Sequence, residues 1–176
     1  IFDETKLPGV FMIEMERLED ARGFFGRSFC RNEFSRKGLN PDVAQCNISF
    51  NRQIGTLRGM HYQAAPHAEA KLIRCTRGRL YDVIVDLRRE SPTFRQWTAV
   101  ELSGENRLML YAPEGCANGF QTLEDDTEVF YQMSEFYHPE SARGVRWNDP
   151  AFGIQWPAGL RAILSERDQS WPDYPV

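Results

Sequence analysis

Short segments in which apolar and polar residues alternate recur along the chain, and turn-forming residues separate them. Such alternation is the pattern of a half-buried β-strand. Their spacing of roughly 8–12 residues is typical of an all-β sandwich or barrel. The segments that show the pattern are GVFMIEMERL (9–18), TLRGMHYQ (56–63), AKLIRC (70–75), LYDVIVDL (80–87), QWTAVELS (96–103), RLMLYA (107–112) and TEVFYQMSEFY (127–137).

The segments between these strands carry turn signals and little helical signal. EDARG (19–23) and PEGCANG (113–119) are predicted to be turns, and TRGR (76–79), centred on Gly78, is predicted to close a β-hairpin. RNEFSRKGL (31–39) predicts two turns of helix that end at Gly38. The tail from residue 147 is rich in Pro, Gly and Trp, which favours an irregular covering segment with one short helix. We therefore predict one all-β domain over 1–176, with short peripheral helices.

Composition excludes several functional classes. The chain has 176 residues, of which 41% are hydrophobic and 26% are charged, as in ordinary globular proteins. No apolar run approaches the roughly 20 residues that cross a bilayer, so we expect no membrane span. The net charge of −4 argues against nucleic-acid binding, but five arginines between 52 and 79 leave room for an anionic small ligand. The four cysteines are widely separated, which predicts free thiols and a cytoplasmic location.

The candidate chemistry centres on His61, one of three histidines in the chain. Strand alternation places Arg58 and His61 on opposite faces, so the two share a site only if Gly59 carries a bulge or kink. Lys71 in AEAKLIR, Tyr131 in EVFYQMS and Asp168 in LSERDQSWP are its candidate companions. Each of these residues taken alone has an ordinary structural interpretation, as a surface lysine, a core tyrosine and a loop aspartate.

A metal centre of the cupin type would need two close histidines, a carboxylate and a later histidine. Here Gln63 stands two positions after His61, His67 lies in a proline-led loop, and Asn118 occupies the later position. This spacing does not assemble a complete set of metal ligands. We therefore expect no metal and no other cofactor.

Seven motifs, in order along nearly the whole chain, resemble the dTDP-4-dehydrorhamnose 3,5-epimerase family. They are DARGFFGRSF, TLRGMHYQ, AKLIRCTRGRLYDVIVDLRRESPTF, PEGCANGFQTL, VFYQMSEFY, RWNDPAFGIQWP and ILSERD. The resemblance implies a cupin-like jelly-roll β-sandwich and a homodimer with shared active sites. It also implies epimerisation of a nucleotide-linked 4-keto-6-deoxyhexose at carbon 3, carbon 5 or both, without a metal.

The resemblance also implies roles for particular residues. His61 matches the base, Asp168 its polarising partner, Tyr131 the general acid, and Lys71 the cation near the keto oxygen of the substrate. Other positions match substrate-binding residues, and the segment around Arg22 is expected to reach the site from a second subunit. This expected binding set comprises Arg22, Arg27, Gln45, Asn47, Arg58, Lys71, Asn118 and Arg167.

Three positions depart from the family pattern. Asn118 stands where members commonly have a histidine, Arg27 where they often have glutamate, and Cys46 where many have aspartate. An asparagine keeps hydrogen-bonding capacity but cannot become cationic. Two alternatives stay open: a 3,4-ketoisomerase of similar fold, which would be expected to use a close histidine pair, and a non-catalytic sugar-binding cupin.

Overall fold

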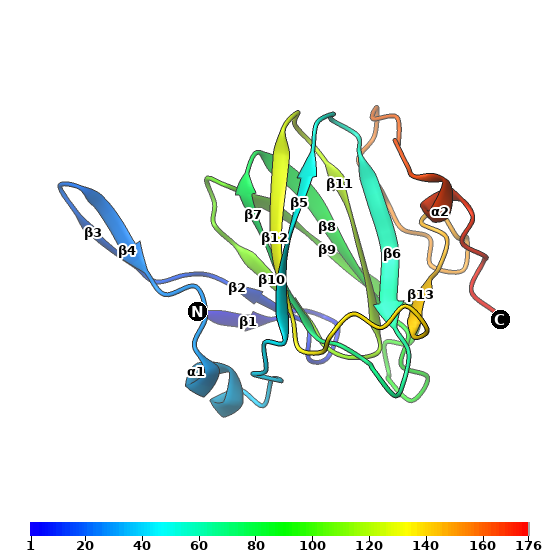
Figure 1. Ribbon diagram of the computed structural model, residues 1–176, viewed down its shortest axis with the longest axis horizontal. Coiled ribbons are helices and arrows are strands. Elements are labelled where there is room, and N and C mark those ends of the chain that lie inside the picture. The colour runs from blue at the N-terminus through cyan, green and yellow to red at the C-terminus, as the bar shows by residue number, and fades with distance from the viewer. Residues whose placement is uncertain (176) are drawn as a thin grey trace.

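The body of the protein consists of two antiparallel β-sheets packed face to face, which is the predicted cupin-like jelly roll (Figure 1). The computed structural model describes residues 1–175. Along the six-stranded sheet the order is β1 (Phe2–Glu4), β2 (Phe11–Ile13), β10 (Met109–Ala112), β7 (Lys71–Arg77), β12 (Thr127–Met133) and β5 (Gln45–Asn51). Along the five-stranded sheet it is β13 (Ala142–Gly144), β6 (Leu57–Gln63), β11 (Cys116–Thr122), β8 (Arg79–Asp86) and β9 (Trp97–Ser103).

A two-stranded arm and two short helices complete the described fold. The arm, β3 (Arg17–Asp20) and β4 (Gly23–Gly26), projects away from the body (Figure 1). Helix α1 (Arg31–Arg36) is followed by Gly38 at φ +73°, which confirms the predicted helix end. Helix α2 (Glu166–Gln169) is the short helix expected in the tail.

Strand β8 illustrates how the sequence builds the core. Successive side chains of a strand point to opposite faces, and both faces of β8 are covered. Leu80 and Ile84 point between the two sheets, where they join the largest apolar cluster with Ile73 and Leu110 of the other sheet. Asp82 has the same parity and is fully buried. A carboxylate therefore occupies a position that strand alternation assigns to the core.

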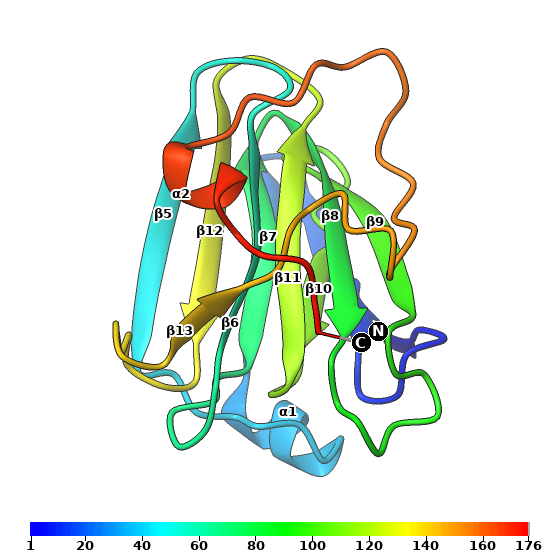
Figure 2. The same ribbon diagram turned by 90° about the vertical axis from the view of Figure 1, so that its right-hand side faces the viewer.

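The C-terminal tail covers the other face of the five-stranded sheet (Figure 2). Val83 and Val85 of β8 pack there against Phe152 and Trp156 of the tail. This confirms the predicted covering segment and explains why LYDVIVDL is apolar on both faces.

The predicted hairpin at Gly78 is wrong. Strands β7 and β8 flank this glycine, but β7 pairs with β10 and β12, whereas β8 pairs with β9 and β11 of the other sheet. Gly78 has φ +75°, and a Cβ there would lie 2.5 Å from Oγ1 of Thr127. The glycine thus lets the chain cross from one sheet to the other beside β12.

The segment 113–119, predicted as a turn, is a turn only in its first part. From Cys116 the chain forms β11, which lies between β6 and β8. The first predicted strand, 9–18, also differs, since it divides between β2 of the main sheet and β3 of the arm. Strand β5 is absent from the predicted strands. Its pattern is inverted: the polar Gln45, Asn47 and Ser49 are half-buried, whereas the apolar Ile48 and Phe50 are exposed.

Candidate active site

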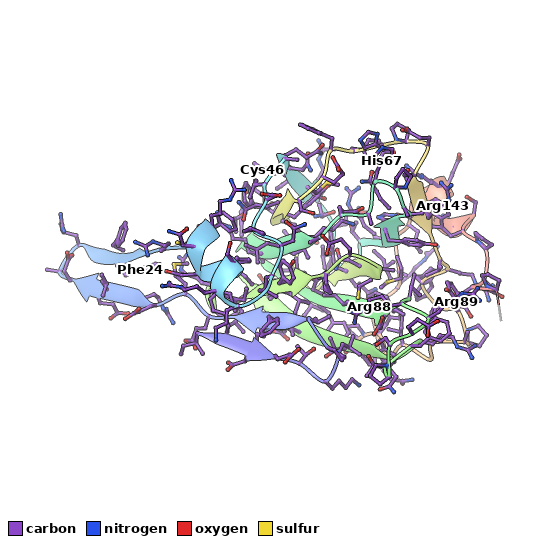
Figure 3. The ribbon with its side chains drawn as sticks, turned by 90° about the horizontal axis from the view of Figure 1, so that it is seen from below. Phe24, Cys46, His67, Arg88, Arg89 and Arg143 are labelled. Atoms are coloured by element: carbon purple, nitrogen blue, oxygen red, sulfur yellow. The ribbon has the colours of Figure 1, made fainter. Side chains whose placement is uncertain are left out.

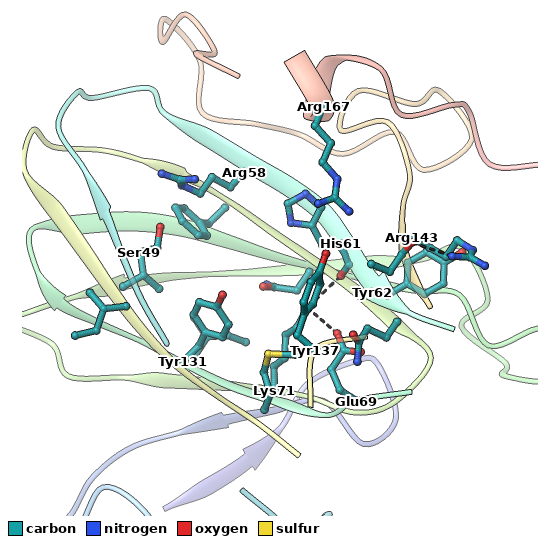
Figure 4. A pocket seen from close by; sticks show the side chains of 18 of the residues that line it. Ser49, Arg58, His61, Tyr62, Glu69, Lys71, Tyr131, Tyr137, Arg143 and Arg167 are labelled. Atoms are coloured by element: carbon teal, nitrogen blue, oxygen red, sulfur yellow. Dashed lines mark hydrogen bonds and ion pairs between the residues drawn. The ribbon is translucent and has the colours of Figure 1, made fainter. Parts of the chain in front are cut away.

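A cavity of about 430 Å³ opens between the two sheets (Figure 4). Strands β6 and β11 of the five-stranded sheet line one side of it, and strands β5, β7 and β12 of the six-stranded sheet line the other. Helix α2 contributes Arg167 at the rim. Six of the predicted residues line this cavity, namely Arg58, His61, Lys71, Asn118, Tyr131 and Arg167.

Arg58 and His61 reach the same cavity because strand β6 does not alternate regularly. The pairing of β6 with β11 changes register between Asn118 and Phe120, opposite Gly59. Gly59 has φ +139°, and a Cβ there would lie 2.5 Å from Cα of Gly119. The bulge that the sequence required at Gly59 is therefore present, and only glycine fits the close approach.

His61 and Asp168 form a hydrogen-bonded pair across 107 positions of the chain. Nε2 of His61 lies 2.6 Å from Oδ1 of Asp168, and Asp168 is only 5% exposed. Asp168 is held in place because its backbone N–H donates to Oγ of the helix-capping Ser165. Trp171 Nε1 donates to the same carboxylate oxygen at 3.2 Å.

The donor and the acceptor in the His61–Asp168 hydrogen bond can be assigned. Burial by itself would raise the pKa of Asp168, but the hydrogen bond and charge of His61, with the N–H groups of Trp171 and Gly59, outweigh it and lower that pKa. An ionised carboxylate only accepts hydrogen bonds, so Nε2 of His61 carries the hydrogen. Nδ1 is then the nitrogen with a free lone pair. This arrangement suits a base whose protonated form Asp168 stabilises.

Tyr131 lies on the opposite sheet from His61, on β12. It shares its cavity-facing side with Val129 and Met133, as strand parity predicted. Burial raises the pKa of Tyr131, the nearby Arg58 lowers it and Glu69 raises it further, with a net increase. The phenol is therefore protonated at neutral pH and can act as an acid.

Lys71 is paired with a residue that the sequence analysis missed. Nζ of Lys71 lies 3.0 Å from Oε1 of Glu69, and the Glu69 side chain is only 2% exposed. Nζ also donates to the backbone oxygen of His61 at 3.4 Å. The spacing of two positions between Glu69, just before β7, and Lys71, the first residue of β7, was the available signal. The pair holds the lysine beside His61 (Figure 4).

The cavity is strongly cationic although the chain is acidic overall. Arg58, Lys71, Arg143 and Arg167 line it, against the single carboxylate of Glu69. The Arg58 side chain is fixed by a 2.7 Å hydrogen bond from Nε to Oδ1 of Asn51. Arg143 was not predicted, because its short strand β13 gives no pattern in the sequence. An excess of cations in a cleft favours an anionic ligand such as a diphosphate.

Four predicted binding residues do not line the cavity of their own chain. Arg22 stands at the tip of the β3–β4 arm, where it pairs with Asp20. Arg27 pairs with Glu33 near the base of the arm. Gln45 and Asn47 lie on β5, and Asn47 pairs with Tyr131 across the sheet. Figure 3 shows the separation, with Phe24 of the arm and Arg143 at opposite ends of the molecule.

Asn118 is bound to the buried Asp82. Nδ2 of Asn118 donates to Oδ1 of Asp82 at 2.7 Å and to the backbone oxygen of Val83 at 3.2 Å. Burial raises the pKa of Asp82 to about 7, against smaller lowering effects of Asn118, Lys71 and the Val83 backbone. The second oxygen of Asp82 is buried without a hydrogen-bond partner among the described residues.

One group among residues 1–175 brings metal-ligand atoms together, and it does not include His61. His67, His138 and Glu140 each offer one ligand atom, all within 4.8 Å of one another. The rings of His67 and His138 are stacked, with centroids 3.5 Å apart and an interplanar angle of 10°. Imidazole lone pairs lie in the ring planes, so in this stacked arrangement they do not converge on one ion.

None of the helices among residues 1–175 is long and apolar enough to cross a membrane.

A jelly roll with a histidine on one sheet, bonded to an aspartate of the covering tail, and a tyrosine on the facing sheet is the architecture of a cupin-like isomerase. The family model described as dTDP-4-dehydrorhamnose 3,5-epimerase matches residues 4–175, and the chain belongs to this family. A dTDP-4-dehydrorhamnose 3,5-epimerase of Sinorhizobium fredii is 43% identical over 171 residues, which cover 97% of this chain and 88% of that protein.

Solved structures agree with this assignment. The dTDP-4-dehydrorhamnose 3,5-epimerase of Elizabethkingia anophelis superposes with a TM-score of 0.95 at 40% identity, covering 99% of this chain and 96% of that one. A dTDP-6-deoxy-D-glucose-3,5-epimerase from Legionella pneumophila, in complex with dTDP-4-keto-L-rhamnose, gives a TM-score of 0.92 at 36% identity, covering 98% and 92%.

The raised pKa of Asp82 predicts a specific dependence of stability on pH. Folded Asp82 keeps its proton up to about pH 7, whereas the unfolded chain releases it near the ordinary aspartate pKa of 3.8. The free energy of unfolding should therefore fall as pH rises through this window, by roughly 1.4 kcal/mol per pH unit for this group. Asp82→Asn should remove the loss, so the variant gains stability relative to wild type at pH 8 but not at pH 4.

Urea unfolding of both proteins at pH 4, 5, 6, 7 and 8 measures this difference. The exposed Asp3→Asn is the matched control and should follow the wild-type curve. Parallel curves for wild type and Asp82→Asn would show that folding does not raise the pKa of Asp82.

Proposed function

We propose that the protein epimerises carbon 3, carbon 5 or both in a nucleotide-linked 4-keto-6-deoxyhexose, as a step in deoxysugar biosynthesis. The observation that carries this proposal is the position of the acid and the base. His61, which is hydrogen-bonded to Asp168 of helix α2, lies on one sheet and Tyr131 lies on the other, and both His61 and Tyr131 line one cavity. Inversion of a carbon needs a proton removed from one face and another delivered to the opposite face.

The first step is proton abstraction. The ketone at carbon 4 acidifies the hydrogens on carbons 3 and 5, and Nδ1 of His61 takes one of them as the C–H electron pair moves toward the keto oxygen. Histidine suits this work because its reference pKa lies near neutral pH. Asp168 stabilises the imidazolium that forms. The product of this step is an enolate.

Lys71 supplies the charge that the enolate requires. Its ammonium group lies within the cavity beside His61, fixed by Glu69. A preorganised cation near a developing oxyanion is worth more in the transition state than in the ground state. Arg58, Arg143 and Arg167 complete a cationic lining that fits the diphosphate of a nucleotide sugar.

The second step returns a proton to the same carbon from the other side. Tyr131 faces the cavity from β12 and is protonated at neutral pH. Its hydroxyl donates to the carbon as the enolate collapses to the ketone. Solvent then returns a proton to the tyrosinate and accepts the proton held by the His61 imidazolium, which restores both groups. The atoms balance without an oxidant, a reductant or a metal.

The two alternatives are disfavoured by particular residues. A 3,4-ketoisomerase with a close histidine pair would need a second imidazole near His61, but Gln63 holds that place and bonds to the backbone of His67, Phe136 and His138. A sugar-binding protein would have no need of the buried Asp168 beneath His61. Localisation in the cytoplasm is supported by the four free cysteines.

A homodimer with shared active sites is part of the proposal. The β3–β4 arm exposes Leu18, Phe24 and Phe25, and Phe25 is 69% exposed. Ile48 and Phe50 of the edge strand β5 are exposed beside the cavity. Apolar side chains exposed in this way favour burial against a second copy. Arg22 at the arm tip could then reach the neighbouring cavity.

Solvent deuterium tests the reaction. In heavy water, the enzyme acting on dTDP-4-keto-6-deoxyglucose should place deuterium at carbons 3 and 5, detected by NMR, with carbon 3 labelled faster. Tyr131→Phe should retain exchange through His61 but lose inversion, because only the opposite-face donor is missing. Tyr81→Phe, on the far side of the same sandwich, is the control and should invert normally. Absence of label with dTDP, CDP, UDP and GDP sugars would leave only the sugar-binding alternative.

Substitution of the base tests its identity. His61→Asn should lower turnover at least about a hundredfold, the usual contribution of a positioned general base, with the fold retained by circular dichroism. Asp168→Asn should also slow turnover, because the imidazolium loses its stabilising charge. His67→Asn should keep the wild-type rate. A His61→Asn enzyme with near-normal turnover would remove His61 from the mechanism.

Complementation tests the shared site. Arg22→Ala and His61→Asn should each be poorly active, but refolding equal amounts together should restore about a quarter of wild-type turnover. Half of the dimers are then mixed, and one of their two sites combines an intact arm with an intact base. Sedimentation should give a dimer for wild type and a monomer for Phe25→Asp. Lack of recovery on mixing would place each site within one chain.

A further inference from the structure

We propose that Asn118 determines substrate specificity by presenting its side-chain oxygen to the cavity, where it accepts a hydrogen bond from a ring hydroxyl of the sugar. Asp82 is the positioning residue that fixes this orientation. The inference rests on the proposed function for the class of ligand, a nucleotide-linked 6-deoxyhexose, and goes beyond it in naming what one residue recognises.

The neighbours of Asn118 determine which way its amide points. The amide atom that faces Val83 lies 3.2 Å from a backbone carbonyl, and the same atom lies 2.7 Å from Oδ1 of Asp82. A backbone carbonyl can only accept a hydrogen bond. The atom facing both oxygens must therefore be the –NH₂ group. The flipped amide would set an oxygen against two acceptors.

The opposite end of the amide is consequently an unused acceptor. Oδ1 of Asn118 receives no hydrogen bond from residues 1–175, and it is not among the buried unpaired atoms of that range. Asn118 is part of the cavity lining and is half-buried. An acceptor in a cavity selects a donor, so it fits a hydroxyl group and not the keto oxygen.

Asn118 lies next to the base. It pairs with His61 across strands β6 and β11. A hydroxyl bound to the side-chain oxygen of Asn118 would hold the sugar ring beside the imidazole of His61. Across the cavity lie Lys71, at the start of β7, and Glu69, just before that strand. The bond therefore bears on ring orientation as well as on affinity.

Asp82 can hold this orientation in either protonation state. It is fully buried on the cavity side of β8, between Leu80 and Ile84. Oδ1 accepts from Asn118 when the carboxyl is ionised, and it still accepts when a proton sits on the unpartnered Oδ2. Titration of Asp82 therefore changes the charge beside the cavity and leaves the amide orientation unchanged.

Binding measurements with unreactive sugars test the inference independently of turnover. Titration calorimetry would compare dTDP-6-deoxyglucose, which has no ketone, with its 2-deoxy and 3-deoxy analogues. Wild type should bind one of the two analogues about tenfold more weakly, because the Asn118 oxygen loses its donor. In Asn118→Leu, which matches the side-chain size but has no acceptor, that difference should fall below about twofold.

Further variants separate recognition from folding. Asn118→Leu leaves Oδ1 of Asp82 unpartnered, so the double variant Asn118→Leu, Asp82→Leu removes both partners together and should also lose the discrimination. Asp82→Asn, whose side-chain oxygen can still accept from Asn118, should keep it. Asn118→His is expected to change the preference between analogues, because an imidazole can be cationic.

Each outcome decides the inference. Equal binding of all three sugars to wild type would overturn it, and so would a hydroxyl preference that persists unchanged in Asn118→Leu. Failure of every sugar nucleotide to bind would overturn this inference together with the proposed function. Hydroxyl discrimination without any turnover would remove the proposed reaction and support the recognition role of Asn118.

Discussion

The contact between Gly59 of β6 and Gly119 of β11 is the constraint on which the site depends. Neither glycine has room for a side chain: a Cβ on Gly119 would lie 2.9 Å from the backbone oxygen of Arg58, and one on Gly59 would lie 2.5 Å from Cα of Gly119. The approach shifts the β6–β11 register at this point. Arg58 and His61, which strand parity would place on opposite faces, then line one cavity, and Asn118 comes to lie beside His61.

Around this contact, the molecule places groups of opposite character on the two walls of the cavity. The wall formed by β6 carries His61, which is hydrogen-bonded to Asp168 in the tail. The wall formed by β12 carries Tyr131, whose burial keeps its proton in place. A jelly roll suits inversion chemistry because two sheets face each other across one space. In the proposed reaction, His61 and Tyr131 would need no flexible loop to reach opposite sides of a sugar ring.

Most buried charged side chains in and around the cavity have a partner that offsets the free-energy cost of removing them from water. Lys71 is nearly buried but meets Glu69, and Asp168 is buried but meets His61 and Trp171. Asp82 is the exception, since one of its oxygens has no partner among the described residues and its pKa rises to about 7. A buried carboxylate is costly to ionise, and the side chain that Asp82 contacts is Asn118.

The sequence by itself determined the all-β fold class and the covering tail, because strand alternation and turn signals are local properties. Its resemblance to the family pointed to six of the residues that line the cavity. The sequence also showed that Arg58 and His61 can share a site only if Gly59 carries a bulge or kink, because the alternation of faces can be followed within one strand. Only the tertiary structure decided that β7 and β8 lie in different sheets, that 116–122 is a strand, and that Arg22 and Arg27 lie away from the cavity of their own chain. It alone revealed Glu69 beside Lys71 and Asp82 beneath Asn118. Strand pairing and the partners of buried charges join residues far apart in the chain, and the free energy of such contacts leaves no periodic trace in the sequence.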